Sequence, residues 1–217
     1  DRIVHLVACI RSFKPIANWG KFVLCLHTPS EWLYSLVDRE LTEGGFDYEL
    51  TRTFEDDPWL PFGTTYMKLL ESSQAEYVLN FIEDHFLIAD PSNLSVLLNK
   101  MYFHGCDIMK ATFFHVEHET LKNIKDKLED QHAFYYNNTH DAHIQAQKLW
   151  ARYYIGVNFI TTYEFAKKFW DRGDFTDQHS SRPHWYEQPF YKKEFEHKVL
   201  IPKTEVLTSI DDDHGIG

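Results

Sequence analysis

Residues Tyr77 to Ile88 read YVLNFIEDHFLI. Apolar and aromatic residues fill most of its positions, a composition typical of a strand that is covered on both faces of a sheet. Glu83, Asp84 and His85 interrupt this composition, and burying a charge without a partner is costly. We therefore expect these three residues at the end of a strand, where they open onto a cleft or hold a cation.

Strand-like and helix-like segments alternate on the amino-terminal side of this stretch. The pattern predicts strands over Ile3–Ile10, Phe22–Leu26, Phe46–Phe54 and Tyr77–Ile82, a helix from Thr28-Pro29-Ser30-Glu31 to Gly44-Gly45, and a helix over Thr64–Ser73. This alternation favours an α/β fold with a mixed, mostly parallel sheet flanked by helices. In such sheets the ligand crevice lies beyond the carboxyl ends of the strands.

The carboxy-terminal side of the chain is less regular. Asp90-Pro91-Ser92 predicts the start of a helix over Asn93–Phe103. The pattern also predicts helices over Glu117–Asp130, Ile144–Tyr154 and Thr162–Trp170, with strands over Cys106–Phe114, Val157–Thr161 and Lys198–Ile201. Asp171–Pro189 is rich in Gly, Ser, Pro and His, and we expect an irregular binding loop there.

Length and composition indicate one compact domain, because 217 residues with 43% hydrophobic content can bury a sizeable core. The chain has 22 Lys and Arg against 33 Asp and Glu, a net charge of −11 that argues against duplex nucleic-acid binding and suits the recruitment of divalent cations. No stretch approaches the roughly 20 apolar residues of a membrane span. The three cysteines are far apart and are expected to be reduced core residues. We therefore expect a cytoplasmic protein, at most peripheral to a membrane.

Three places in the chain together resemble glycosyltransferases of the GT-A type, closest in style to the large family 2 of nucleotide-sugar-dependent transferases. They are LVACIRSF at the end of the first predicted strand, FGTTYMKLLESSQAEYVLNFIEDHFLI around the acidic segment, and NFITTYEFAKKF followed by RPHWYE. The resemblance implies a single Rossmann-like domain over residues 1–217. Residues 1–115 would form the nucleotide-sugar-binding half, and residues 116–217 would bind the acceptor and carry catalysis.

The resemblance also implies a metal site. In that family an acidic motif binds a divalent ion that bridges the two phosphates of the sugar donor, and Glu83, Asp84 and His85 match it here. Many relatives have a second carboxylate where this chain has His85, so Mn²⁺ is expected in preference to Mg²⁺. His214, within SIDDDHGIG, resembles a late metal ligand of the family. The alternative is that Glu83 and Asp84 cap a turn or form salt bridges, and that the acidic terminus is a solvated tail.

The remaining site residues are assigned by position in the family's pattern. Arg11 and Ser12 match the nucleotide-contacting turn. His27 and Thr28 stand where relatives commonly place an acidic nucleotide contact, which leaves the base of the donor open. Glu187, in RPHWYE, matches the carboxylate that takes the proton of the acceptor hydroxyl in inverting members.

The function implied is transfer of a hexose from a nucleotide diphosphate sugar to a hydroxyl acceptor in glycan biosynthesis, with inversion. Two alternatives stay open. A nucleotidyltransferase would share the strand-end metal chemistry but needs basic residues along a triphosphate path. The protein could instead be a non-catalytic carbohydrate- or protein-binding module of the same fold, in which the acidic segment would be structural.

Overall fold

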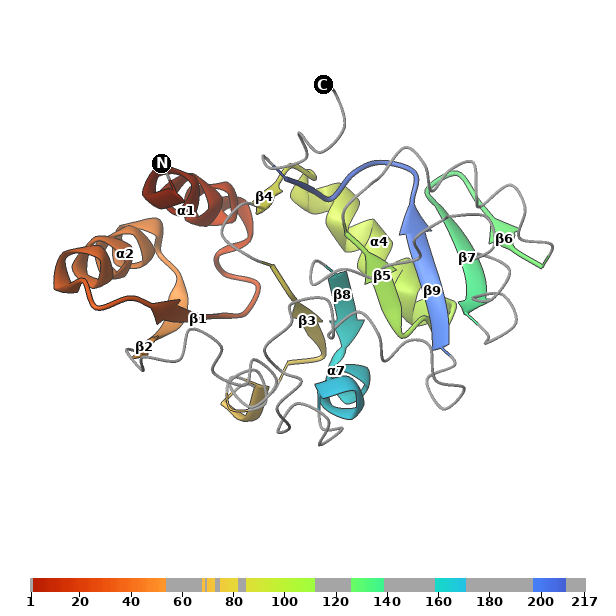
Figure 1. Cartoon of the computed structure of the whole chain (residues 1–217). Coiled ribbons are helices and arrows are strands. Elements are labelled where there is room, and N and C mark those ends of the chain that lie inside the picture. The colour runs from red at the N-terminus through yellow and green to blue at the C-terminus, as the bar shows by residue number, and fades with distance from the viewer. Residues whose placement is uncertain are drawn as a thin grey trace, which may run out of the picture.

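The computed structural model describes residues 2–53, 68, 70–72, 75–81, 85–111, 126–138, 159–170 and 197–209 (Figure 1). The helices in these ranges are α1 (Arg2–Ser12), η1 (Lys14–Ile16), α2 (Glu31–Gly44), α4 (Pro91–Phe103) and α7 (Tyr163–Trp170). The strands are β1 (Lys21–His27), β2 (Asp47–Thr53), β3 (Tyr77–Leu79), β4 (His85–Leu87), β5 (Ile108–Lys110), β6 (Leu128–Glu129), β7 (Ala133–Asn138), β8 (Phe159–Thr162), β9 (His197–Pro202) and β10 (Leu207–Ser209).

The largest sheet has the strand order β3-β8-β5-β9-β7-β6, so its first four strands come alternately from residues 1–115 and residues 116–217. In this sheet β5 and β9 pair in parallel, whereas the other neighbours pair antiparallel. β1 and β2 form a separate parallel pair, and β4 and β10 form an antiparallel one. The predicted mixed α/β fold is therefore confirmed, while parallel pairing among the described strands is limited to β1/β2 and β5/β9.

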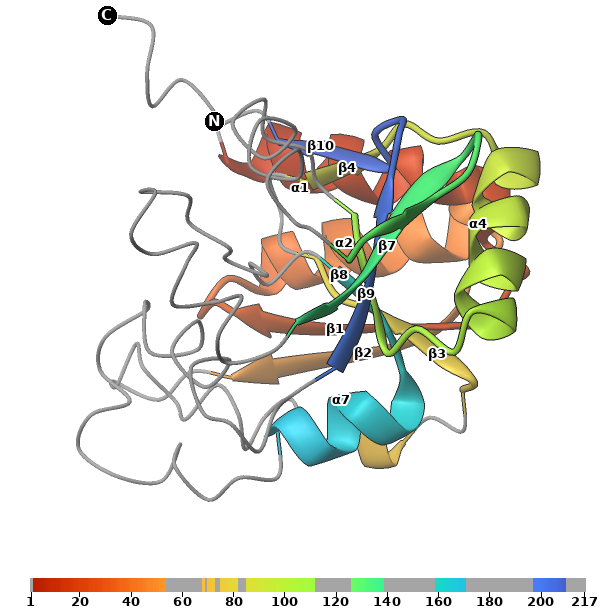
Figure 2. The same cartoon turned by 90° about the vertical axis from the view of Figure 1, so that its right-hand side faces the viewer.

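Helices cover both sides of the strands. In Figure 2, α1 and α2 lie on one side of β1 and β2, and α7 lies on the other side. One apolar cluster joins residues of α1, α2 and α4 to the strands. None of the helices in the described ranges has the length and apolar character needed to cross a membrane.

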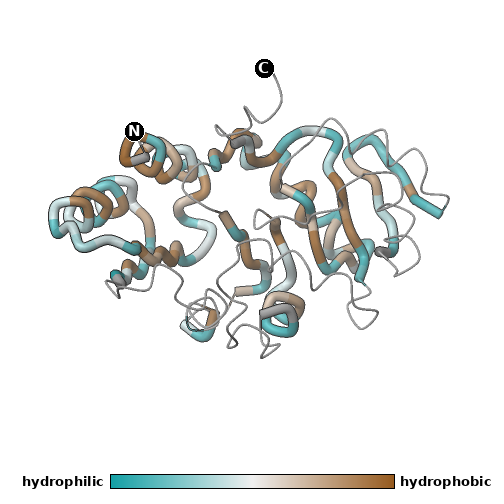
Figure 3. The backbone as a smooth tube through the Cα atoms, in the orientation of Figure 1, coloured by the Kyte–Doolittle hydropathy of each residue, from teal (hydrophilic) through white to brown (hydrophobic). Residues whose placement is uncertain are grey.

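Side chains of the central strands alternate between two buried faces. Met109, Ile160 and Leu200 belong to the cluster that packs under α1, α2 and α4. Their neighbours Ile108 and Phe159 point to the opposite face and are also buried. Figure 3 shows the hydrophobic segments gathered on these strands and on the helices next to them. Burying one such side chain stabilises the fold by about 1.5–3 kcal/mol.

The predicted helix ends of α2 and α4 are confirmed. The Ser30 side chain accepts a hydrogen bond from the N–H of Leu33 at the start of α2, and Gly45 ends that helix at a φ of 74°. The Asp90 side chain accepts a bond from the N–H of Ser92 at the start of α4, and Pro91 occupies its first turn. The strands predicted in the β1, β2, β3, β5, β8 and β9 regions and the helix corresponding to α7 are also confirmed, several with shorter bounds.

The strand predicted over Ile3–Ile10 is wrong, because this segment is helix α1. Leu6, Cys9, Ile10 and Phe13 follow the spacing of one helical face and pack into the core, whereas Val4 is 69% exposed. Arg11 and Ser12 consequently end a helix and do not follow a strand.

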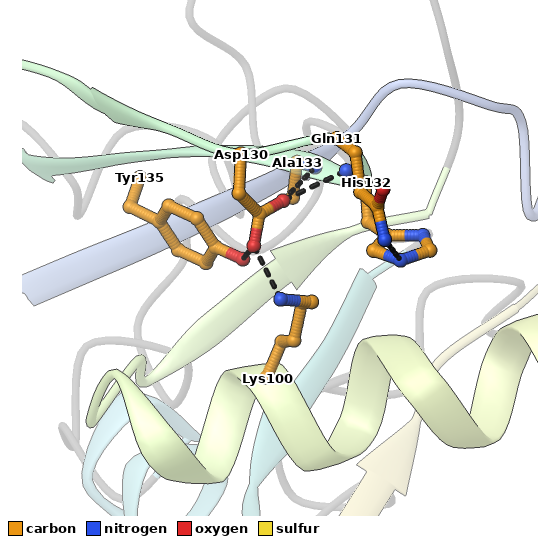
Figure 4. A network of polar contacts seen from close by, with 6 residues as sticks. All are labelled: Lys100, Asp130, Gln131, His132, Ala133 and Tyr135. Carbon is orange, nitrogen blue, oxygen red and sulfur yellow. Dashed lines mark hydrogen bonds and ion pairs between the residues drawn. The ribbon is translucent and has the colours of Figure 1, made fainter.

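The helix predicted over Glu117–Asp130 is wrong at its carboxyl end, where Leu128–Glu129 form β6. Asp130 then organises the turn into β7. Its carboxylate accepts bonds from the N–H groups of His132 (2.7 Å) and Ala133 (3.0 Å), from the Tyr135 hydroxyl (2.9 Å) and from Lys100 of α4 (Figure 4). Most of the helix predicted over Thr64–Ser73, all of the helix predicted over Ile144–Tyr154 and the loop Asp171–Pro189 lie outside the described residues.

Candidate functional site

One edge of the six-stranded sheet collects the carboxyl ends of three strands. β3 and β5 each run antiparallel to β8, and β9 runs parallel to β5, so β3, β5 and β9 end on the same side. We call this the carboxyl edge and define it by Asn80, Lys110, Ala111 and Pro202. In mostly parallel α/β sheets ligands bind at the carboxyl ends of the strands, and β3, β5 and β9 share one direction here as strands of such a sheet do.

The β4/β10 pair lies at the carboxyl edge. The N–H groups of Val206 and Leu207 donate to the Ala111 carbonyl at 3.2 and 2.8 Å, and the Val206 carbonyl accepts from Ile88 and Ala89 at 3.0 and 3.2 Å. These bonds tie β4 and β10 to the end of β5. The acidic segment Glu83-Asp84-His85 therefore joins the end of β3 to a strand at the same edge.

His85 is the member of that segment within the described residues. It opens β4, its side chain is 5% exposed, and its backbone lies opposite Ser209 of β10. Glu83, Asp84, His214 and Glu187 lie outside the described residues. Because Ser209 precedes His214 by five positions, the chain leading to that histidine departs beside His85.

Arg11 is engaged in a structural ion pair. Its guanidinium donates two bonds to the Glu40 carboxylate of α2, both at 2.7 Å, in a bidentate arrangement. The bond from Arg11 lowers the pKa of the Glu40 carboxyl, whose side chain is 9% exposed. Since the strand end on which its nucleotide role rested does not exist, we leave Arg11 out of the candidate site.

Ser12 also has structural partners. Its hydroxyl donates to the Cys9 carbonyl at 2.7 Å and accepts from the N–H of Leu87 in β4 at 2.9 Å. Ser12 therefore contacts the strand that His85 opens.

His27 and Thr28 do lie at the end of a strand, β1, as predicted. His27 is exposed. Thr28 is 9% exposed, and its hydroxyl accepts a bond from the N–H of Ser30 ahead of α2. Of this pair, His27 is the side chain that can reach a ligand in solvent.

Two polar residues at the carboxyl edge were missed from the sequence. The backbone N–H of Asn80 donates to the Phe159 carbonyl at 2.9 Å, which extends the β3/β8 ladder, and Lys110 pairs with Phe159 on its other side. Asn80, Phe159 and Lys110 thus share one face of the sheet. Asn80 and Lys110 are 1% and 6% exposed, and burial lowers the pKa of Lys110 to about 7. A polar residue inside each apolar run, YVLNF and CDIMKATFF, was the available signal.

The described residues alone do not complete a metal centre. Within them, no three His, Cys, Asp or Glu side chains gather in a way that could hold an ion. The metal site expected from the sequence would take one imidazole from His85, a donor that suits Mn²⁺, and its carboxylates from Glu83 and Asp84.

No family model, curated protein or solved structure matches this chain. Its function is therefore inferred from the geometry of the carboxyl edge and from the chemistry of the residues around it.

Proposed function

We propose that this protein is a metal-dependent glycosyltransferase of the GT-A type, which moves a sugar from a nucleotide diphosphate sugar to a hydroxyl acceptor with inversion. The pairing of His85 with Ser209 at the carboxyl edge is the observation that carries the proposal. It places His85, which directly follows Asp84, opposite Ser209, which precedes His214 by five positions.

Covalent connection limits how far these residues can be from each other. An extended chain spans at most about 3.3–3.6 Å per residue, so His214 lies no more than about 18 Å from Ser209, and Asp84 directly precedes His85. Glu83, Asp84, His85 and His214 would together offer carboxylate and imidazole ligands, which suit Mn²⁺ or Mg²⁺.

A divalent ion bound there would stabilise the negative charge that develops on the diphosphate as it leaves. Glu187 would accept the proton of the acceptor hydroxyl. His27, exposed at the end of β1, is the remaining candidate for contact with the nucleoside. The proposal does not rest on LVACIRSF, since this stretch belongs to α1.

A thermal-shift experiment with UDP, GDP and CDP, each with and without Mn²⁺, tests the proposal. We expect one diphosphate to raise the melting temperature in the presence of Mn²⁺, by roughly 5–10 °C at a ligand concentration about 100 times its Kd. Asp84→Ala should abolish the Mn²⁺-dependent part of this shift. Glu164→Gln, which alters an exposed carboxylate of α7, is the matched control and should retain it.

Other outcomes would contradict the transferase. An unchanged shift in Asp84→Ala would remove Asp84 from the site. Absence of any response to the three diphosphates would favour a non-catalytic binding module. A response to nucleoside triphosphates with release of pyrophosphate would favour a nucleotidyltransferase.

A further inference from the structure

The carboxyl end of α1 contacts the chain on both sides of the acidic segment. Phe13, directly after α1, places its ring 4.6 Å from the ring of Phe81, measured between centroids. Ser12, the last residue of α1, accepts a hydrogen bond from the N–H of Leu87 at 2.9 Å. Two consecutive residues therefore hold positions 81 and 87, and Glu83, Asp84 and His85 lie between those positions.

The bond from Leu87 to Ser12 satisfies an amide that β10 does not reach. Ile88 donates its N–H to Val206 on the β10 side, so the N–H of the preceding residue points to the opposite edge of β4. Leu87 is 7% exposed, and a buried N–H without an acceptor is unfavourable. The Ser12 hydroxyl donates its own proton to the Cys9 carbonyl at 2.7 Å, which leaves its lone pairs directed at Leu87.

α1 itself is firmly fixed. Cys9 and Ile10 are fully buried, and Phe13 is 1% exposed. The Phe13 ring also packs against Phe22 of β1, with centroids 5.7 Å apart, and Arg11 binds Glu40 of α2 through two hydrogen bonds. The Ser12 hydroxyl at the end of this helix therefore has a defined position. A residue that orients a ligand-binding segment needs such a fixed position.

We propose that Ser12 and Phe13 are positioning residues, which fix the chain at Phe81 and Leu87, on both sides of the acidic segment, and thereby support the binding of the divalent ion. The effect on ion binding rests on the proposed function, whereas the anchoring of the segment does not. Ser12 acts through its hydrogen bond to Leu87 of β4. Neither Ser12 nor Phe13 is required to touch the ion or the nucleotide.

Two measurements on the same variants test this proposal: hydrogen exchange at individual amides, and the Kd for Mn²⁺ from titration. In Ser12→Ala the Leu87 amide should exchange about tenfold faster or more, because it loses its acceptor, and the Kd for Mn²⁺ should rise about tenfold. Exchange at Ile160, in the buried centre of β8, should stay slow and serves as the check that the variant is folded.

Ser12→Thr keeps the hydroxyl and should restore both values. Ser35→Ala removes the hydroxyl of an exposed serine in α2 and should change neither. Phe13→Leu keeps an apolar side chain but loses the ring contact with Phe81, and should weaken Mn²⁺ binding independently of the Ser12 bond.

Unchanged Leu87 exchange in folded Ser12→Ala would overturn the anchoring. If the Leu87 amide exchanges faster in Ser12→Ala but the affinity for Mn²⁺ is unchanged, Ser12 has no positioning role, and its bond to Leu87 serves the fold alone. If the wild-type chain binds no Mn²⁺, the proposed function fails and the role in ion binding fails with it, while the exchange rates still decide whether Ser12 anchors β4.

Discussion

Asn80 and Lys110 show how single residues are set into the carboxyl edge. The Nδ2 of Asn80 donates to the Phe159 carbonyl at 3.5 Å, which fixes the orientation of the amide. Its Oδ1 is buried, and no residue in the described part of the chain donates to it. On the other side of Phe159, Lys110 brings an amine into the same apolar face. Polar groups are costly at such positions, so both residues are candidates for a functional role.

Lys110→Met is expected to change how stability depends on pH. Burial lowers the pKa of Lys110 to about 7, whereas an unfolded lysine titrates near 10.4. Between about pH 7 and pH 10 the unfolded chain therefore binds more protons at this position than the folded chain, and the free energy of unfolding should rise with pH. The variant should lose this rise, which urea titrations at several pH values would measure.

Lys167→Met, at an exposed position of α7, is the control and should keep the wild-type slope. If the free energy of unfolding depends on pH in the same way in Lys110→Met and in the wild type, burial does not lower the pKa of Lys110.

At the scale of elements, the sequence predicts helices best where their ends carry specific chemistry. Ser30 and Asp90 cap α2 and α4 through their side-chain oxygens, and Gly45 takes the positive φ that ends α2. These signals are local, so they can be read without knowledge of the tertiary fold.

The error at Ile3–Ile10 has the opposite cause. The run Ile3–Ile10 fits a buried strand as well as a helix, since every position except His5 is apolar and periodicity cannot separate the two. The helix is distinguished from a strand only by packing in the folded chain, where Cys9 and Ile10 are buried in the core and Val4 is exposed. β7 was missed because its pairing with β9 depends on residues 59 to 69 positions away, from Asn138 opposite His197 to Ala133 opposite Pro202.

Asp130→Asn is expected to loosen the β6–β7 turn from α4. Burial raises the pKa of the Asp130 carboxyl, but the bonds from Lys100, the His132 and Ala133 amides and the Tyr135 hydroxyl outweigh it and hold the pKa well below its usual value. The stability that these bonds give is present above about pH 4 and is lost as the pH falls toward the folded-state pKa. The variant should lose about 1–2 kcal/mol at pH 7.

Urea denaturation of both proteins from pH 7 to pH 2 measures this difference in the free energy of unfolding. The gap between wild type and Asp130→Asn should be constant above about pH 4 and should narrow below it. A gap that stays constant into acid would mean that the carboxylate is not stabilised by its partners.

At the scale of the whole molecule, the candidate site depends on long-range pairing. β8 lies between β3 and β5, and the end of the chain returns to place Ser209 opposite His85, 124 positions away in sequence. The sequence shows that Val206 and Leu207 are apolar and precede the acidic terminus, a composition that suits an ordered segment. It could not indicate the register, which is set by the fold of everything between the two strands.

Paramagnetic broadening by Mn²⁺ in an NMR spectrum tests the proposal that a divalent ion binds where β4 and β10 meet. We expect substoichiometric Mn²⁺ to broaden the amide signals of His85 and Ser209 first, with those of Lys167 and Lys168 on α7 unaffected, and Asp84→Ala to remove the effect. Broadening that leaves His85 and Ser209 sharp, or that persists unchanged in Asp84→Ala, would contradict the account.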